Sequence, residues 1–157
     1  MVEEKQKIYD FIEGVKSMSH FTKVKTEFKE RDALITAIKN LKGWQVEVHE
    51  TEQHLYGYRG DRRQQAAHLI VRREQINPAS NDLGFHCNED GIYNAIISEW
   101  DAANPLKGFI KELTKEYSVV CTENFARSRG MIVERTRHQD GRLQLRLSVP
   151  QQQVIRR

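Results

Sequence analysis

The chain has 157 residues, of which 38% are hydrophobic and 30% are charged. This length predicts one globular unit with at most a short appendage, and it excludes a large multidomain machine. An aromatic share of 8% and only 3 prolines argue against wholesale disorder, because so many rings can offset the ordering entropy by burial. The net charge of +3 gives a weak overall field, so charge alone does not predict a nucleic-acid binder.

Cysteine content and hydropathy indicate the cellular environment of the chain. Cys87 and Cys121 allow at most one disulfide, and nothing resembling a secretory leader precedes them. We therefore expect a reducing, cytoplasmic environment. No apolar run approaches the roughly 20 residues that a membrane span needs, so no membrane association is expected.

Residues 1–17 are the first segment with a clear period. Ile8, Phe11, Ile12 and Val15 fall at i, i+3, i+4 and i+7, which predicts an apolar stripe on a short amphipathic helix. A helix of about thirteen residues is marginal alone, so the stripe needs a partner surface. We expect this extension to bury Ile8, Phe11 and Ile12 against the body, against a protein partner or in a homo-oligomer.

A strand, a helix and a second strand follow in that order. Residues 22–28 alternate between apolar and polar side chains, as a half-buried strand does. Leu34 and Ile38 lie in an apolar stripe at helical spacing, and Gly43 is suited to end that helix. Residues 44–49 alternate again, which predicts the second strand.

Residues 51–65 are polar and irregular, which indicates a long connection between two strands with exposed rings. Loops often carry functional residues. Tyrosine and arginine are both enriched at interaction hot spots, so this loop is a candidate recognition surface. The predicted partner-binding residues in it are Tyr56, Tyr58, Arg59, Arg62 and Arg63.

The remaining elements are a strand, a hairpin, a helix and a second hairpin. A strand is predicted over 67–73, and the turn Asn88-Glu89-Asp90-Gly91 separates the two strands of the first hairpin. Asn104 followed by Pro105 predicts the start of a long or broken helix that reaches Gly130. The clearest strand alternation in the chain then lies in a hairpin over 131–149.

This element order predicts an α+β fold in which two helices cover one face of an antiparallel sheet, because each alternating strand demands one covered and one wet side. A ferredoxin-like arrangement is one candidate for it. We expect residues 18–149 to form a single domain and residues 150–157 to form a flexible tail.

Several short motifs then resemble a known family in their order and spacing. They are Met18-Ser19-His20-Phe21 with Thr22-Lys23-Val24-Lys25-Thr26, Gly43-Trp44, Gly57-Tyr58, and Gly84-Phe85 before Asn88-Glu89-Asp90-Gly91. Over about residues 18–149 the chain resembles the hypothetical chloroplast reading frame thirty-five family, also called domain of unknown function twelve fifty-seven, of cyanobacteria, algal plastids and other bacteria. Members usually begin at the Met-Ser-His-Phe signature, whereas this sequence has residues 1–17 ahead of it.

The resemblance implies no catalytic residue. It implies a small soluble protein inside the cell, in the cytoplasm or, in plastid-bearing relatives, the plastid stroma. Members of the family are similar to proteins often encoded beside ATPases of the AAA type, which suggests such an ATPase as a partner.

No constellation typical of catalysis or metal binding is recognisable in the sequence. The six histidines are scattered, and the pair His49-Glu50 with His54 has the wrong spacing for a zinc-protease helix. No nucleophile elbow or phosphate-cradling glycine loop is present. We therefore expect no catalytic residue, no metal ion and no cofactor. A small hydrolase or nuclease would require a pocket with converging histidines and carboxylates.

Basic residues concentrate at the C-terminal end. From residue 126 onward the sequence has eight arginines and two acidic residues, which gives a net charge of +6 and leaves −3 for the rest of the chain.

The main functional prediction is a non-enzymatic module that binds a protein. The alternative is RNA or DNA binding through this hairpin and the Tyr/Arg loop. Of these two explanations of the arginines, we favour charge that protects an edge strand from aggregation over nucleic-acid binding. The residues of the nucleic-acid alternative are Arg135, Arg137, Arg142 and Arg146.

Overall fold

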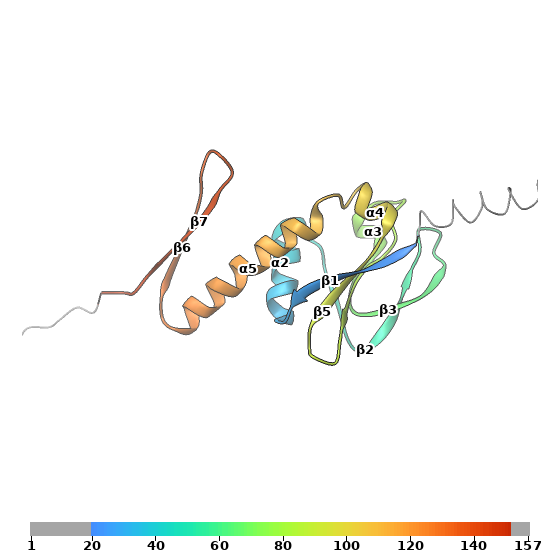
Figure 1. The fold of residues 1–157 in the computed structure, drawn as a ribbon, viewed down its shortest axis with the longest axis horizontal. Helices are drawn as coiled ribbons and strands as arrows, with labels where there is room; N and C mark the ends of the chain where they lie inside the picture. Colours follow the sequence, from blue (N-terminus) through green and yellow to red (C-terminus); the bar gives the residue numbers. More distant parts are fainter. Residues whose placement is uncertain (1–19, 152–157) are drawn as a thin grey trace, which may run out of the picture.

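The computed structural model describes residues 20–151 and confirms the expected α+β class. A five-stranded antiparallel sheet has its two long helices on one face, and a separate two-stranded hairpin follows (Figure 1). The helix predicted within residues 1–17, with Ile8, Phe11 and Ile12, lies outside the described residues, as does most of the predicted tail at 150–157.

Four strands of the sheet follow one another as a meander, and the first strand of the chain pairs with the last of them at one edge. Its strands have the order β1-β5-β4-β3-β2, and every neighbouring pair is antiparallel. They are β1 (Phe21–Phe28), β2 (Glu47–Tyr56), β3 (Arg62–Val71), β4 (Leu83–Cys87) and β5 (Tyr93–Ser98). The helices are α2 (Arg31–Lys42), α3 (Arg73–Ile76), α4 (Glu99–Ala103) and α5 (Phe109–Ser128), and the hairpin consists of β6 (Ile132–Arg137) and β7 (Leu143–Ser148).

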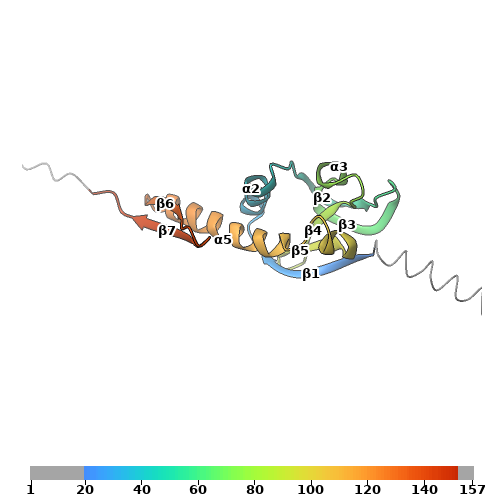
Figure 2. The ribbon, with the colours of Figure 1, turned by 90° about the horizontal axis from the view of Figure 1, so that it is seen from above.

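This strand order excludes a ferredoxin-like arrangement, in which two strand-helix-strand units interlock within one sheet. Here β1 and β2, the two strands that flank α2, lie at opposite edges of the sheet. The strands that follow α5 pair only with each other and lie beside the C-terminal part of that helix, apart from the sheet (Figure 2). The ferredoxin-like candidate is therefore wrong, although the class that it belongs to is right.

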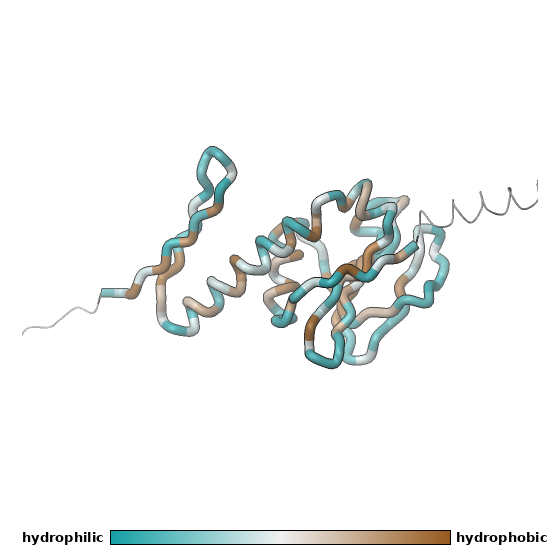
Figure 3. The backbone as a smooth tube through the Cα atoms, viewed as in Figure 1, coloured by the Kyte–Doolittle hydropathy of each residue, from teal (hydrophilic) through white to brown (hydrophobic). Residues whose placement is uncertain are grey.

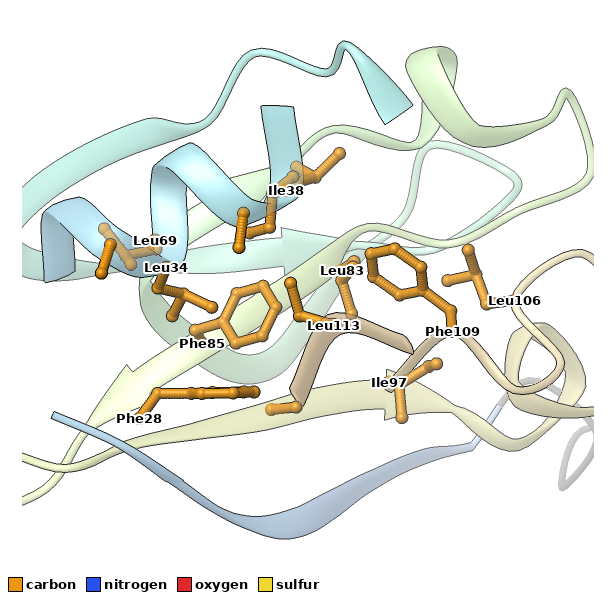
Figure 4. Close-up of a cluster of buried hydrophobic side chains, with 14 of the residues drawn as sticks. Phe28, Leu34, Ile38, Leu69, Leu83, Phe85, Ile97, Leu106, Phe109 and Leu113 are labelled. Atoms are coloured by element: carbon orange, nitrogen blue, oxygen red, sulfur yellow. The ribbon is translucent and has the colours of Figure 1, made fainter. Parts of the chain in front are cut away.

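The main core lies between the sheet and the two long helices (Figure 4). Leu34 and Ile38 of α2 and Leu113 of α5 are fully buried against the sheet. Phe28 packs edge-on against Phe85, with ring centroids 6.2 Å apart. Burial of each large apolar side chain contributes about 1.5–3 kcal/mol, so this cluster is the principal source of stability.

A smaller core lies on the other face of the sheet. Leu55 of β2 and Ala67 of β3 belong to it, with Phe21, Ile70 and Ile96. A side chain at Gly84 would come within 2.8 Å of Ala67 and 2.9 Å of Leu55. Leu55 of β2 and Ala67 of β3 thus pack directly on the backbone of β4 at Gly84, where only glycine fits.

Two element boundaries differ from the sequence prediction. The connection expected over 51–65 is mostly strand, since only residues 57–61 separate β2 from β3. Its polarity reflects an exposed edge strand, because most of β2 faces solvent. The helix expected from Pro105 begins instead at Phe109, and Asn104 ends the short helix α4 by donating its N–H to the carbonyls of Trp100 and Asp101.

The C-terminal hairpin is confirmed, with Val133 opposite Leu147 and Arg135 opposite Leu145. We call residues 127–151, which contain it, the C-terminal arm. Hydropathy alternates along β7, whereas β6 is apolar at its start and polar afterwards, and the turn between them is polar (Figure 3). Between residues 20 and 151, no helix has the length and apolarity that crossing a membrane requires.

Candidate functional site

The predicted partner-binding residues lie at one end of the β2–β3 hairpin. Tyr56 ends β2, Tyr58 and Arg59 lie in the connecting loop, and Arg62 and Arg63 begin β3. Tyr56 is 40% exposed. Tyr58 and Arg63 are half-buried, and Arg59 and Arg62 are exposed. All five therefore lie at the same end of the hairpin, and three of them, Tyr56, Arg59 and Arg62, are exposed to solvent.

The loop between the two strands is a tight turn. The N–H of Gly57 donates to the carbonyl of Asp61, and the N–H of Gly60 donates to the carbonyl of Gly57, both at 2.8 Å. Gly60 has a φ of 77°, in the left-handed region that favours glycine. A side chain at Gly57 would meet Asp61 at 2.5 Å. The turn thus has little freedom to move.

Two buried polar residues bind the loop backbone from below. Asp82 accepts the N–H of Tyr56 on Oδ2 at 2.7 Å and donates its own N–H to the Tyr56 carbonyl at 2.9 Å. Asn81 accepts the N–H of Tyr58 on Oδ1 at 2.9 Å. Both side chains are only 1% exposed. The backbone that carries the two rings is therefore fixed to the interior of the protein.

Arg72 links this support to the surface. Its Nη1 donates to Asp82 at 2.8 Å, and its Nε and Nη2 donate to the two oxygens of Glu47 at 2.6 Å and 2.9 Å. The paired hydrogen bonds from Arg72 lower the pKa of Glu47, and those from Glu47 raise the pKa of Arg72. The guanidinium also lies 5.7 Å from the centroid of the Tyr56 ring, so it contacts the exposed ring as well as the buried carboxylate.

Asn81 is positioned by a second layer of hydrogen bonds. Its Nδ2 donates to Ser98 Oγ at 2.9 Å and to Asp101 Oδ2 at 3.1 Å. Ser98 Oγ donates to the same carboxylate oxygen at 2.6 Å and caps α4. A continuous buried chain of polar groups thus connects α4 to the loop that carries Tyr58. This chain could not be predicted from the sequence, because residues 77–82 have the composition of an ordinary polar loop.

A polar cavity of about 330 Å³ opens beside Tyr56. Most of its polar groups are already engaged. Arg72 is bound by carboxylates, and His54 Nδ1 lies 2.7 Å from the carbonyl of Arg63. Arg62 is different, since its guanidinium has no hydrogen bond or ion pair within the described part of the chain, although its backbone pairs with Tyr56. The cavity is lined by Gln53, His54, Tyr56, Arg62 and Arg72.

A larger cavity of about 500 Å³ lies at the start of α2, between Lys29 and Tyr93. Its lining does not bring histidines and carboxylates together, which is the arrangement that a hydrolase or nuclease would need. Among residues 20–151, no group of three or more His, Cys, Asp or Glu side chains is placed to bind a metal ion.

The structure also brings together two histidines that the sequence separates. His68 of β3 and His86 of β4 face each other with ring centroids 4.9 Å apart. His86 Nε2 lies 2.8 Å from a carboxylate oxygen of Glu52, and His68 Nδ1 accepts the N–H of Cys87 at 3.0 Å. Desolvation, followed by the charge of His86, lowers the pKa of His68.

The four arginines of the nucleic-acid alternative are divided between two faces. Side chains alternate across a strand, so Arg135 and Arg137 share one face of the hairpin and Arg142 and Arg146 the other. Arg135 pairs with Glu116 at 3.0 Å and with Glu123, both on α5. Arg142 pairs with Asp140 at 2.6 Å. The structure therefore does not gather the four into a single basic surface.

Comparison with known proteins supplies a family. The sequence model of the family described as "Protein of unknown function (DUF1257)" matches residues 37–146, more than half of the chain. The chain belongs to this family. The DUF1257 match begins within α2 and ends in β7, so it includes both the Tyr/Arg loop and most of the C-terminal arm, and it confirms the resemblance to domain of unknown function twelve fifty-seven. Neither a curated protein nor a solved structure matches the chain.

Proposed function

We propose that this DUF1257 protein is a non-enzymatic interaction module that docks a protein partner through Tyr56, Tyr58, Arg59 and Arg62. We call these four residues the Tyr/Arg surface. The observation that carries the proposal is the buried support beneath them, because Asn81 and Asp82 fix the backbone of both tyrosines. Exposed rings on a mobile loop would give no reason to propose a docking surface.

A rigid aromatic surface favours binding for a physical reason. Ordering an interface side chain and its loop costs free energy on association, about 0.5–1.5 kcal/mol for each rotamer-rich side chain. Here the loop is already ordered by its own turn and by the buried carboxylate. The guanidinium of Arg59 lies 5.2 Å from the centroid of the Tyr58 ring, which restricts both side chains before a partner arrives.

The charge of the surface indicates the kind of partner. The guanidinium of Arg62 lines the cavity beside Tyr56 and has no hydrogen bond or ion pair within the described residues, and Arg59 is exposed. A protein that places a carboxylate near Arg62 and apolar surface on Tyr56 would satisfy both. Family resemblance makes an ATPase of the AAA type the first candidate to try as bait.

Affinity purification of the full chain from its native host tests this proposal. The wild-type protein should recover a stoichiometric partner, and Tyr58→Ala combined with Arg62→Ala should lose it. Removing two hot-spot residues typically weakens binding by at least 30-fold. Lys39→Ala combined with Lys107→Ala is the matched control, since both lysines are exposed on other elements. Recovery of only the bare chain under every condition would count heavily against docking.

The nucleic-acid alternative is supported by one observation, the charge of +6 from residue 126 onward. Arg137 and Arg146 have no ion pair within the described residues, so both could contact phosphate groups. Phosphate binding releases counterions, so affinity should fall steeply as salt rises. A gel-shift assay at low salt with single- and double-stranded RNA and DNA tests it, and the absence of any shift removes it.

A further inference from the structure

The hairpin of the C-terminal arm is an incomplete sheet. Within the described chain, β6 and β7 pair only with each other, and none of the residues from 127 to 151 is buried. A two-stranded hairpin is marginally stable in water, and independent stability needs three or more strands with an apolar face or a helix packed on it. Helix α5 contacts β6, but it leaves every residue of the arm at least partly exposed. The two-stranded sheet of the arm would therefore be stabilised by a further strand paired to one of its edges.

One face of the hairpin carries four apolar side chains beside Arg135 and Arg137. Val133, Leu143, Leu145 and Leu147 all point to it, because they lie opposite one another or two residues apart in the ladder. Leu147 is 40% exposed. The arm is attached at this face by Arg135, whose guanidinium pairs with two carboxylates of α5. These ion pairs leave the outer edge of β7 open.

We propose that two copies of the chain associate by pairing their β7 strands edge to edge, antiparallel and centred on Leu145. In this register Leu145 meets its own copy across the two-fold axis, and Leu143 meets Leu147. On the opposite face Gln144 meets Arg146 and Arg142 meets Ser148. Each of these unlike pairs occurs twice in the dimer.

The charges of β7 select this register. Centring the pair on Gln144 would set Arg142 against Arg146, and centring it on Arg146 would set that arginine against its own copy. Like charges directly opposite each other are destabilising. A one-residue shift would set each leucine against a polar residue. The two arginines thus oppose the neighbouring pairings and leave the one centred on Leu145.

The other edge of the hairpin is less suitable. Antiparallel self-pairing of β6 about its middle sets either Glu134 against Glu134 or Arg135 against Arg135. Both arrangements place like charges in direct opposition. The sequence of β7, which alternates leucine with Gln144 and Arg146, has a centred pairing without that penalty.

The β7 pairing also makes the apolar face continuous. Val133 already lies opposite Leu147 within the hairpin, so Leu143 of the second copy would extend that row across the new interface. The neighbouring row would contain Leu145 from both copies. Arg135 flanks this row on each side, and its charge is matched by Glu116 and Glu123. The result is a four-stranded sheet with an apolar centre.

Sedimentation equilibrium of the full chain tests the proposal through two opposite changes at one position. Gln144→Arg places a like charge opposite Arg146 twice in the dimer, and we expect the dimer dissociation constant to rise by about 2- to 30-fold. Gln144→Glu places an opposite charge there, and we expect a fall of about the same size.

Two control variants isolate the interface. Gln144 Oε1 lies 2.8 Å from His138 Nε2, so His138→Ala removes this contact without adding charge. Thr136→Arg adds a charge on the same face of the hairpin but on β6, away from the β7 edge. Both should leave the dissociation constant within about twofold of the wild-type value, because cross-strand effects fall off beyond direct neighbours.

Three outcomes would overturn the proposal. The first is a wild-type chain that stays monomeric to its solubility limit. The second is a dimer whose dissociation constant fails to move in opposite directions for Gln144→Arg and Gln144→Glu. The third is a dimer that is lost when residues 1–17 are deleted but ignores both changes, which would assign association to the N-terminal segment instead. Circular dichroism confirms that each variant is folded.

Discussion

The five-stranded body and the C-terminal arm illustrate two ways in which a strand can be used. In the body, alternate residues of β3, β4 and β5 are covered by α2 and α5, and Leu69, Phe85 and Ala95 are fully buried. In the arm the alternation continues along β7, but Leu143 and Leu145 are only partly buried and Leu147 is 40% exposed. A period of two therefore predicts a strand without predicting what covers it.

The same contrast separates the two kinds of polar contact. Asp82 and Asn81 are buried in the body, and each hydrogen bond there compensates a group that water cannot reach. Arg142 and Asp140 pair in the arm with side chains 77% and 53% exposed, where an ion pair contributes little. The body is thus stabilised by its own interior, whereas the arm is held to the body by the ion pairs of Arg135 with α5.

The largest test of this contrast is a pair of truncations. Phe85→Ala removes a fully buried ring that packs on Phe28, and we expect a loss of about 3–5 kcal/mol in the free energy of unfolding. Leu147→Ala removes a side chain that is 40% exposed, and we expect less than about 1 kcal/mol. Urea denaturation followed by circular dichroism measures both. Equal losses would show that the arm belongs to the same cooperative core.

A second test concerns the support beneath the Tyr/Arg surface. Asp82→Ala leaves Arg72 and the N–H groups of Tyr56 and Arg73 without their shared carboxylate, and we expect a loss of about 2–4 kcal/mol. Partner binding should weaken as well, because the loop is no longer fixed.

Asp61→Ala is the control for this second test. Asp61 lies in the same loop and pairs with Arg63 at 2.6 Å, but its side chain is 46% exposed. We expect a cost below about 1 kcal/mol. If the two aspartates proved equivalent in urea denaturation, the buried support would have no special importance.

The sequence predicted the body well wherever one periodicity dominated. The stripe through Leu34 and Ile38 defined α2, Gly43 ended it in the left-handed conformation, and the turn at Asn88 to Gly91 joined β4 to β5. Strand order was not predicted, because alternation records which face of a strand is covered and is silent on which neighbour it pairs with.

The prediction of the candidate site was less complete. Tyr56, Tyr58, Arg59 and Arg62 do lie together, but the long loop that was expected around them is only residues 57–61. Asn81, Ser98 and Asp101 were missed since their roles depend on contacts between distant segments. One signal existed in the sequence, because Ser98 and Asp101 have the spacing of a helix N-cap with an acidic residue in the first turn.

A smaller effect is expected where the arm joins the body. Arg135→Ala removes both ion pairs to α5, and we expect amide hydrogen exchange in β6 and β7 to increase by about tenfold. The urea midpoint of the body should hardly change, because the arm contains no buried residue. Arg137→Ala is the matched control, since Arg137 lies on the same face as Arg135. Protection that persists in the Arg135 variant would mean that other contacts attach the arm.

The smallest expected effect is a pH dependence that belongs to the body alone. The pKa of His68 is lowered in the folded protein, first by desolvation and then by His86, while Glu52 opposes the shift. As pH falls below the ordinary value of 6.5, the unfolded chain therefore takes up a proton before the folded chain does, and stability declines until the folded group also titrates. At higher pH both states are neutral, and the group contributes nothing.

Urea midpoints at pH 7.5 and 5.5 measure this decline, and His68→Gln should reduce it because glutamine has no charge to gain. Gln offers an oxygen that can accept the N–H of Cys87 in place of the imidazole nitrogen, so the change tests titration rather than loss of that hydrogen bond. Exchange rates in β6 and β7, corrected for intrinsic pH dependence, should not follow the His68 transition. His68 lies on β3, whereas β7 pairs with β6 and β6 contacts α5. A decline of unchanged size in the variant would assign the acid sensitivity to other groups, and a parallel change in the arm would show that body and arm open together.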